Sequence, residues 1–128
     1  MILITGGAAQ GKRTFAAERL GITEFADGGT ALLDELMKAE CVTDYQLAVK
    51  RLMEEGADPL AFTEKLCAEG KVRAVIMNEI GCGIVPIDRA ERLWRENAGR
   101  CGCIIAANAG TVIRMVCGIP TAIKGELP

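Results

Sequence analysis

The chain opens with a run of apolar residues that stops at a pair of glycines. Residues 1–5 read Met-Ile-Leu-Ile-Thr, and Gly6 and Gly7 follow directly. A short aliphatic run that ends at glycine is typical of a buried strand leading into a turn. Residues 12–20 consist of helix-forming types, and Gly21 provides a stop. The amino-terminal pattern therefore predicts a strand, a loop and a helix, the first unit of an α/β fold.

Helical patterns recur further along the chain. Thr43 and Gln46 have the spacing of a capping box, and apolar residues then recur at helical intervals as far as Gly56. Asp58-Pro59 opens a second helix that stops near Gly70. A third helix is opened by Pro86 and Asp88 and continues to residue 108.

Apolar runs between these helices predict further strands. Residues 72–77 and 111–117 indicate buried strands, and residues 121–124 indicate a short edge strand. Residues 30–34 fit either a strand that ends on Asp34 or the start of a helix through Met37. Strands separated by helices require right-handed crossovers, which give a mostly parallel sheet with helices on both faces. We therefore expect one α/β domain over residues 1–128, a three-layer sandwich.

Composition narrows the class of protein. Of the 128 residues, 50% are hydrophobic and 25% are charged, with a net charge of −2. This balance argues against disorder and against a nucleic-acid-binding surface, and no apolar run reaches the length of a membrane helix. The first residues lack the basic lead of a secretory signal, so we expect a cytoplasmic protein without a membrane partner. The six cysteines then indicate buried, reduced thiols rather than a zinc site assembled from Cys41, Cys67, Cys82 and Cys117.

The loop after the first strand carries the clearest chemical motif. Residues 6–12 fit the pattern Gly-x-x-x-x-Gly-Lys between a predicted strand and a predicted helix. Such a loop wraps a polyphosphate with backbone N–H groups, and the helix amino terminus and the lysine add positive charge. We therefore expect ATP or GTP to bind at nine consecutive residues: Gly6, Gly7, Ala8, Ala9, Gln10, Gly11, Lys12, Arg13 and Thr14.

One residue departs from the complete motif. The position after the lysine normally holds Ser or Thr, whose hydroxyl binds Mg²⁺, whereas this chain has Arg13. A guanidinium can neutralise a phosphate but cannot bind a cation. Thr14 is no simple replacement, because one residue turns the side chain by about 100° around the helix axis. The sequence thus favours phosphate binding more strongly than Mg²⁺-dependent transfer.

A second motif adds a family resemblance. The chain opens with Ile-Thr-Gly-Gly-Ala-x-x-Gly-Lys, carries Asn-Glu-Ile-Gly-Cys-Gly-Ile-Val-Pro at residues 78–86, and continues with Arg-Glu-Asn-Ala-Gly-Arg at residues 95–100. Together these segments resemble the bifunctional adenosylcobinamide kinase and adenosylcobinamide-phosphate guanylyltransferase family of cobalamin biosynthesis. The resemblance covers residues 1–20 and 72–124, and more loosely residues 30–53. It implies a P-loop NTPase-like fold and transfer of a phosphoryl group from a nucleoside triphosphate to the aminopropanol arm of cobinamide.

The resemblance also implies roles for individual residues. Lys12 would hold the β- and γ-phosphates, Asp34 would orient Mg²⁺, and Asn78 and Glu79 would approach the nucleotide and the substrate, so that Lys12, Asp34 and Glu79 form the catalytic set. Asp34, Asn78 and Glu79 each have a structural alternative. Asp34 is equally well explained as a helix N-cap or a solvated acid, and Asn78 and Glu79 as partners of loop backbone.

Two features separate this chain from the family pattern. It contains no histidine, whereas the family transfers guanylyl groups through a covalent histidine, so that activity is not expected here. The stretch that carries the family's histidine is nearly absent. Two interpretations remain open: an active kinase, or a nucleotide-binding sensor or partner subunit without transferase activity. The resemblance further implies a possible homo-oligomer whose subunits complete each other's sites.

Overall fold

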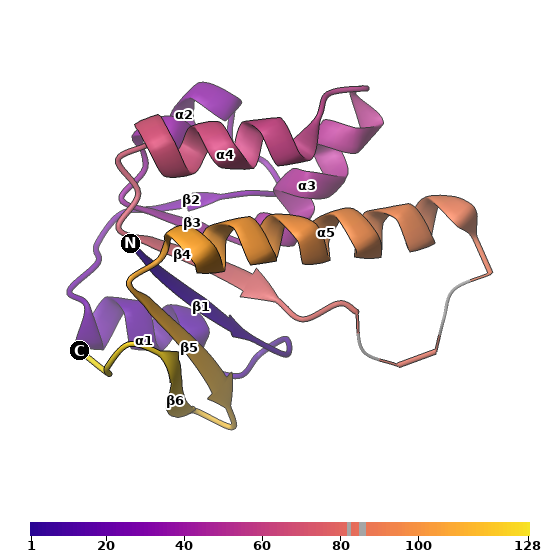
Figure 1. Cartoon of the computed structure of the whole chain (residues 1–128). Helices are drawn as coiled ribbons and strands as arrows, with labels where there is room; N and C mark the ends of the chain where they lie inside the picture. The colour runs from indigo at the N-terminus through magenta and orange to yellow at the C-terminus, as the bar shows by residue number, and fades with distance from the viewer. Residues whose placement is uncertain (82, 85–86) are drawn as a thin grey trace.

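The computed structural model describes all residues except 82, 85 and 86, and the described strands form a six-stranded sheet in the order β2-β3-β4-β1-β5-β6 (Figure 1). The elements in chain order are β1 (Ile2–Gly6), α1 (Lys12–Arg19), β2 (Phe25–Asp27), α2 (Leu33–Lys38), β3 (Cys41–Thr43), α3 (Tyr45–Glu54), α4 (Pro59–Glu69), β4 (Ala74–Asn78), α5 (Arg89–Asn108), β5 (Thr111–Val116) and β6 (Ile119–Lys124). All neighbouring strands pair in parallel except β5 and β6, which form an antiparallel hairpin. The expected mostly parallel α/β sheet is confirmed.

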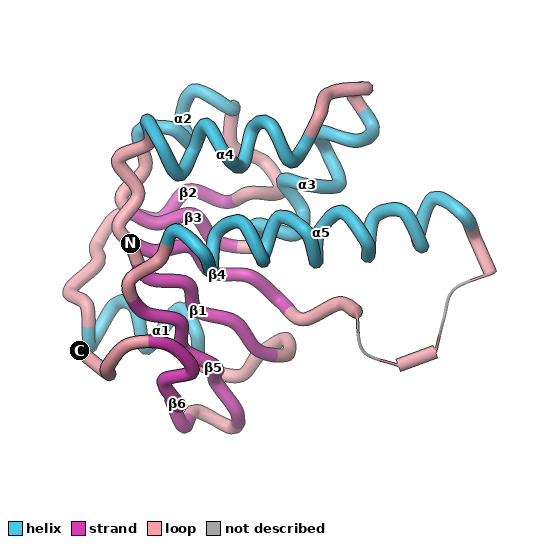
Figure 2. Tube along the Cα trace, in the orientation of Figure 1, coloured by secondary structure: helices cyan, strands magenta, loops and turns pink. Residues whose placement is uncertain are grey.

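Helices cover both faces of the sheet. Successive residues of a strand point to opposite faces, so Leu3 packs with the core beneath α3, α4 and α5, whereas Ile4 packs with Phe15 and Ala16 of α1. Figures 1 and 2 show α1 on one side of the sheet and α2 to α5 on the other. Burial on both faces explains why β1 reads as a continuous aliphatic run.

The order of the strands places one loop at the centre of the sheet. β1 lies between β4 and β5, with Ile4 in register with Ile76 and Ile113. After β1 the chain crosses to β2 at the far edge and returns through β3 and β4, and then continues on the other side of β1 with β5. Ligands of parallel α/β sheets bind where the direction of winding reverses, outside the carboxyl ends of the strands. The loop after β1 occupies this position.

The expected strand at residues 30–34 is wrong. After β2 the chain turns at Gly28 and Gly29, and α2 follows, with Asp34 exposed in its first turn. Short apolar runs fit strand and helix periods alike, and here Leu36 is fully buried when the segment is helical. The helical alternative is therefore correct. The short strands β2 and β3 were not predicted, because three residues are too few to show a period.

The carboxyl-terminal elements agree more closely with expectation. The strands expected at residues 72–77, 111–117 and 121–124 correspond to β4, β5 and β6. Asp58 caps α4 by accepting hydrogen bonds from Leu60 N at 3.0 Å and Ala61 N at 3.2 Å, and Asp88 caps α5. Pro86, the other residue expected to open α5, lies outside the described residues. No helix in the described part of the chain is long and apolar enough to span a bilayer.

Candidate functional site

The loop between β1 and α1, here called the glycine loop (residues 6–11), depends on two glycines with positive φ. Gly6 has a φ of 150°, and a Cβ placed there would lie 2.5 Å from Met115 O in the neighbouring strand. Gly11 has a φ of 91° and stands directly before α1. Only glycine enters such conformations at low cost. These two residues let the loop turn tightly between the strand and the helix.

Lys12 lies in the mouth of the glycine loop and is only 5% exposed. Its ammonium Nζ donates hydrogen bonds to the backbone oxygens of Gly6, at 3.4 Å, and Gly7. Burial lowers the pKa of the Lys12 amine, whereas the charges of Asp44 and Glu79 raise it. The expected cation is therefore present beside the loop, in the field of two carboxylates.

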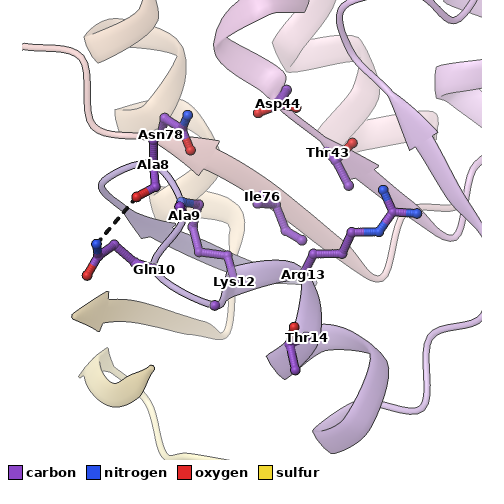
Figure 3. Close-up of a pocket in the computed structure, with 11 residues that line it drawn as sticks. Ala8, Ala9, Gln10, Lys12, Arg13, Thr14, Thr43, Asp44, Ile76 and Asn78 are labelled. Carbon is purple, nitrogen blue, oxygen red and sulfur yellow. Dashed lines mark hydrogen bonds between the residues drawn. The ribbon is translucent and has the colours of Figure 1, made fainter. Parts of the chain in front are cut away.

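A cavity of about 570 Å³, the first cavity, opens between the glycine loop and the ends of β3 and β4. Its volume is within the range typical of small-molecule sites. Figure 3 shows the lining side chains, which come from the glycine loop, the start of α1, the end of β3 with the residue after it, and β4. The lining residues are Ala8, Ala9, Gln10, Gly11, Lys12, Arg13, Thr14, Thr43, Asp44, Ile76 and Asn78.

The carboxylate of the first cavity is Asp44, not Asp34. Asp34 lies on α2, which packs against β2 and α4, and it does not line the cavity. Asp44 follows β3 directly and takes a left-handed conformation with a φ of 49°. The predicted assignment failed because it took residues 30–34 as the strand that ends in an acid. The strand that does so is β3, and its apolar residues Cys41 and Val42 before Thr43 and Asp44 were the available signal.

Gln46 holds the ends of β3 and β4 together. Its buried side chain donates from Nε2 to Asp44 Oδ1 at 3.2 Å and accepts from Asn78 N at 2.9 Å through Oε1. The expected capping box is therefore wrong. Thr43 belongs to β3 and Asp44 stands at the N-cap of α3. Gln46 bonds to the side chain of Asp44 and to the backbone of Asn78 in β4, and not to the backbone N–H of Thr43 as a capping box requires. No local pattern in the sequence indicates this role, since the two bonded partners are brought together only by strand pairing.

Arg13 points along the wall of the first cavity toward β2. Its guanidinium carbon lies 4.5 Å from the centroid of the Phe25 ring, a cation–π contact. Figure 3 shows Arg13 directed away from the glycine loop, whereas Lys12 lies beside it. Arg13 therefore adds positive charge at the side of the cavity rather than at its centre.

Gln10 ties the glycine loop to the turn between β5 and β6. Its side-chain Oε1 accepts a hydrogen bond from Cys117 N at 2.6 Å, and its backbone oxygen accepts one from Gly118 N at 3.1 Å. Its Nε2 donates to Ala8 O at 3.3 Å, within the loop itself (Figure 3). These bonds hold the outer part of the loop against the hairpin.

Residues with strained backbone conformations cluster around the first cavity and the adjoining β5–β6 turn. Within the described residues, the non-glycine residues with positive φ are Ala9, Asp44 and Cys117. The first two line the first cavity, and the third bonds to Gln10. Such conformations cost free energy, and they cluster at functional sites, where the surrounding fold maintains them.

A second cavity, of about 260 Å³, lies between the ends of β1 and β4 and α5. Asn78 borders both cavities, whereas Glu79 borders only this one. The Glu79 carboxylate receives two hydrogen bonds from Arg114 of β5, from Nε at 2.9 Å and from Nη2 at 3.2 Å. Arg114 was missed by sequence reasoning, because it becomes Glu79's neighbour only across the intervening strand β1. The lining residues are Thr5, Met77, Asn78, Glu79, Ile80, Gly81, Arg95, Ala98, Gly99 and Gly102.

A central parallel strand, a glycine loop and a helix that begins with a buried lysine define the P-loop class of α/β folds. Comparison with models of protein families identifies the family within this class. The model of the family described as cobinamide kinase / cobinamide phosphate guanyltransferase matches residues 26–123, and the chain belongs to this family. The matched range begins after the glycine loop and contains both β4 and the segment after it. The comparison with curated proteins gave no match.

Proposed function

We propose that this protein binds a nucleoside triphosphate, ATP or GTP, in the first cavity and transfers its terminal phosphoryl group to a hydroxyl of cobinamide. The observation that carries the proposal is the buried Lys12 ammonium in the mouth of the glycine loop, opposite Asp44. Backbone N–H groups of the loop and the amino terminus of α1 would hold the phosphates. Membership of the cobinamide kinase family supplies the acceptor.

The residues of the first cavity fit the requirements of Mg²⁺. This ion takes one or two carboxylates and completes its shell with phosphate oxygens and water, so it needs no cage of protein ligands. Asp44 is the carboxylate available, and Thr14 is a hydroxyl on the same cavity. When bound with the triphosphate, Mg²⁺ would neutralise charge on the β- and γ-phosphates. No group of three or more acidic, cysteine or histidine side chains that could form a metal site exists among the described residues.

The chain's own groups would act by positioning and charge. Lys12 leaves the carbonyl oxygens of Gly6 and Gly7 and bonds to the phosphates, which carry a full negative charge. Gln46 keeps Asp44 and the Asn78 backbone in fixed relation while this occurs. Histidine-linked guanylyl transfer is not part of the proposal, because the chain contains no histidine.

The replacement of the usual Ser or Thr by Arg13 favours a second candidate, a nucleotide-binding sensor or partner subunit without transferase activity. Titration of ATP and GTP with and without Mg²⁺, followed by a phosphoryl-transfer assay with cobinamide, separates the two. The kinase predicts Mg²⁺-dependent binding and formation of phosphorylated cobinamide. Binding that ignores Mg²⁺, with no phosphorylated product, supports the sensor. Absence of nucleotide binding contradicts both.

A further inference from the structure

The second cavity adjoins the proposed phosphate site but differs from it in lining. Its walls are largely apolar or small: Met77, Ile80, Ala98, Gly99 and Gly102, together with Thr5. Its volume of about 260 Å³ is below that of pockets that enclose whole drug-sized ligands. A cavity of this kind can hold a short branch of a molecule, and the bulk of a macrocycle must remain outside.

One fixed carboxylate borders this cavity. Arg114 holds both oxygens of Glu79, and the Glu79 backbone N–H donates to Gly6 O at 2.9 Å. The glycine loop and Glu79 are thus attached to each other directly. Burial lowers the pKa of the Lys12 amine, and the charge of Glu79 reaches that amine and opposes the shift. Glu79 therefore borders the second cavity and also acts electrostatically on the cation of the first.

We propose that the second cavity receives the hydroxyl-bearing arm of the acceptor, and that Glu79 accepts a hydrogen bond from that hydroxyl. This inference rests on the proposed function. The arm enters between the ends of β1 and β4 and α5, while the ring system stays at the surface. Because Asn78 borders both cavities, the hydroxyl approaches the terminal phosphate from the β4 side.

The transfer step balances with the groups present. The hydroxyl oxygen forms a bond to the γ-phosphorus, and the bond from that phosphorus to the oxygen bridging the β-phosphate breaks. The nucleoside diphosphate leaves with the electron pair. The hydroxyl proton passes to the Glu79 carboxylate and then to water, and Arg114 keeps the carboxylate in place throughout.

Two glycines of α5 create the space for the arm. A Cβ added at Gly99 would meet no atom within 4 Å, and one at Gly102 would meet only Met77 Sδ, at 3.6 Å, and Met77 Cε, at 3.8 Å. Glycine in the middle of a helix is otherwise unfavourable, so these positions give up helix stability and leave the cavity open. Larger side chains can be introduced here without strain.

Gly99→Leu tests the assignment, with Ala107→Leu at an exposed position of the same helix as the matched control. Binding of cobinamide to each protein, saturated with a non-hydrolysable triphosphate, is measured by equilibrium dialysis, and nucleotide affinity is measured separately. We expect Gly99→Leu to weaken cobinamide binding at least tenfold, with nucleotide affinity within twofold of the parent, and Ala107→Leu to change neither. Equal cobinamide binding by the parent and Gly99→Leu, or no binding by the parent, overturns the proposal. The proposed function is tested separately, by nucleotide binding and phosphoryl transfer measured on the parent protein.

Glu79→Gln provides a second test that does not depend on filling space. It keeps the shape of the side chain but cannot take up the proton. We expect kcat to fall about a hundredfold, with the KM for cobinamide and the nucleotide affinity little changed. An unchanged kcat overturns the role of Glu79. A fall in kcat that comes with loss of cooperative thermal unfolding assigns Glu79 a structural role instead and overturns it equally.

Discussion

The two cavities beside β4 are lined by different kinds of structure. The first is formed by the glycine loop, Lys12 and Asp44, and its shape depends on backbone held in costly conformations at Ala9 and Asp44. The second is formed by the side of a regular helix, and its space comes from residues without large side chains. A site for charged phosphates needs directed N–H groups and a cation, whereas a site for a neutral arm needs shape. We therefore propose one cavity for each of the two substrates.

Removal of the Lys12 ammonium should change ligand binding more than any other substitution described below, and it should do so at the first cavity alone. Lys12→Ala deletes the cation of the first cavity, and a hydrogen bond to a charged group contributes up to about 3 kcal/mol, so triphosphate affinity should fall about a hundredfold. Isothermal titration with ATP or GTP measures it. Lys65→Ala, at an exposed position of α4, is the control.

The same variant also tests whether the cavities are separate. Cobinamide binding should remain within a few-fold of the parent, since no wall of the second cavity is altered. If Lys12→Ala binds triphosphate as tightly as the parent protein, the first cavity is not a phosphate site. If it loses both ligands to the same extent, the two cavities do not act as distinct sites.

A smaller effect is expected from the contact between the glycine loop and the β5–β6 turn. Gln10→Ala removes the acceptor of Cys117 N and the donor to Ala8 O, which is worth about 1 kcal/mol and corresponds to about fivefold weaker nucleotide binding. Cobinamide binding should not change. Glu18→Ala, at an exposed position of α1, serves as the control, and equal nucleotide affinities in the two variants would show that the loop does not need this contact.

The smallest effect is expected for the pH dependence of stability, which depends on buried cysteines in the core layers behind the two cavities. Burial, together with the charge of the nearby Glu40, raises the pKa of the Cys41 thiol, on the α1 side, to about 12, although the charge of Arg13 opposes this shift. The folded protein therefore holds this proton more tightly than the unfolded chain, in which a thiol has a pKa of about 8.5. The stabilisation is complete below about pH 8.5 and is lost as the pH rises toward 12, with about 1 kcal/mol lost by pH 9.5.

Urea unfolding at pH 7 and pH 9.5 measures this loss. Burial also raises the pKa of Cys101, on the α5 side, but the hydrogen bond with Thr63 opposes the shift. Cys41→Ala should therefore remove more of the pH dependence than Cys101→Ala. An equal loss of stability between pH 7 and pH 9.5 in the parent and both variants would mean that neither buried thiol controls stability in this range.

The sequence by itself determined the elements with clear periods and the chemistry of the glycine loop. The buried run of β1, the apolar spacing of α3 and the Asp58-Pro59 start of α4 are local signals, because neighbouring residues alone satisfy them. The same holds for Gly6, Gly11 and Lys12, whose types and spacing define the loop before any fold is formed. The motif at residues 78–86 likewise pointed to the family, although Cys82, Val85 and Pro86 lie outside the described residues.

Only the tertiary structure decided which polar and charged groups meet. Asp34 and Asp44 are both acids near short apolar runs, and the choice between them depended on which run enters the sheet beside β4. Gln46 reaches Asn78, and Arg114 reaches Glu79, across 32 and 35 residues of sequence respectively. The pairing of distant strands is selected by the burial of whole faces of the sheet, a sum over many residues that no local pattern contains.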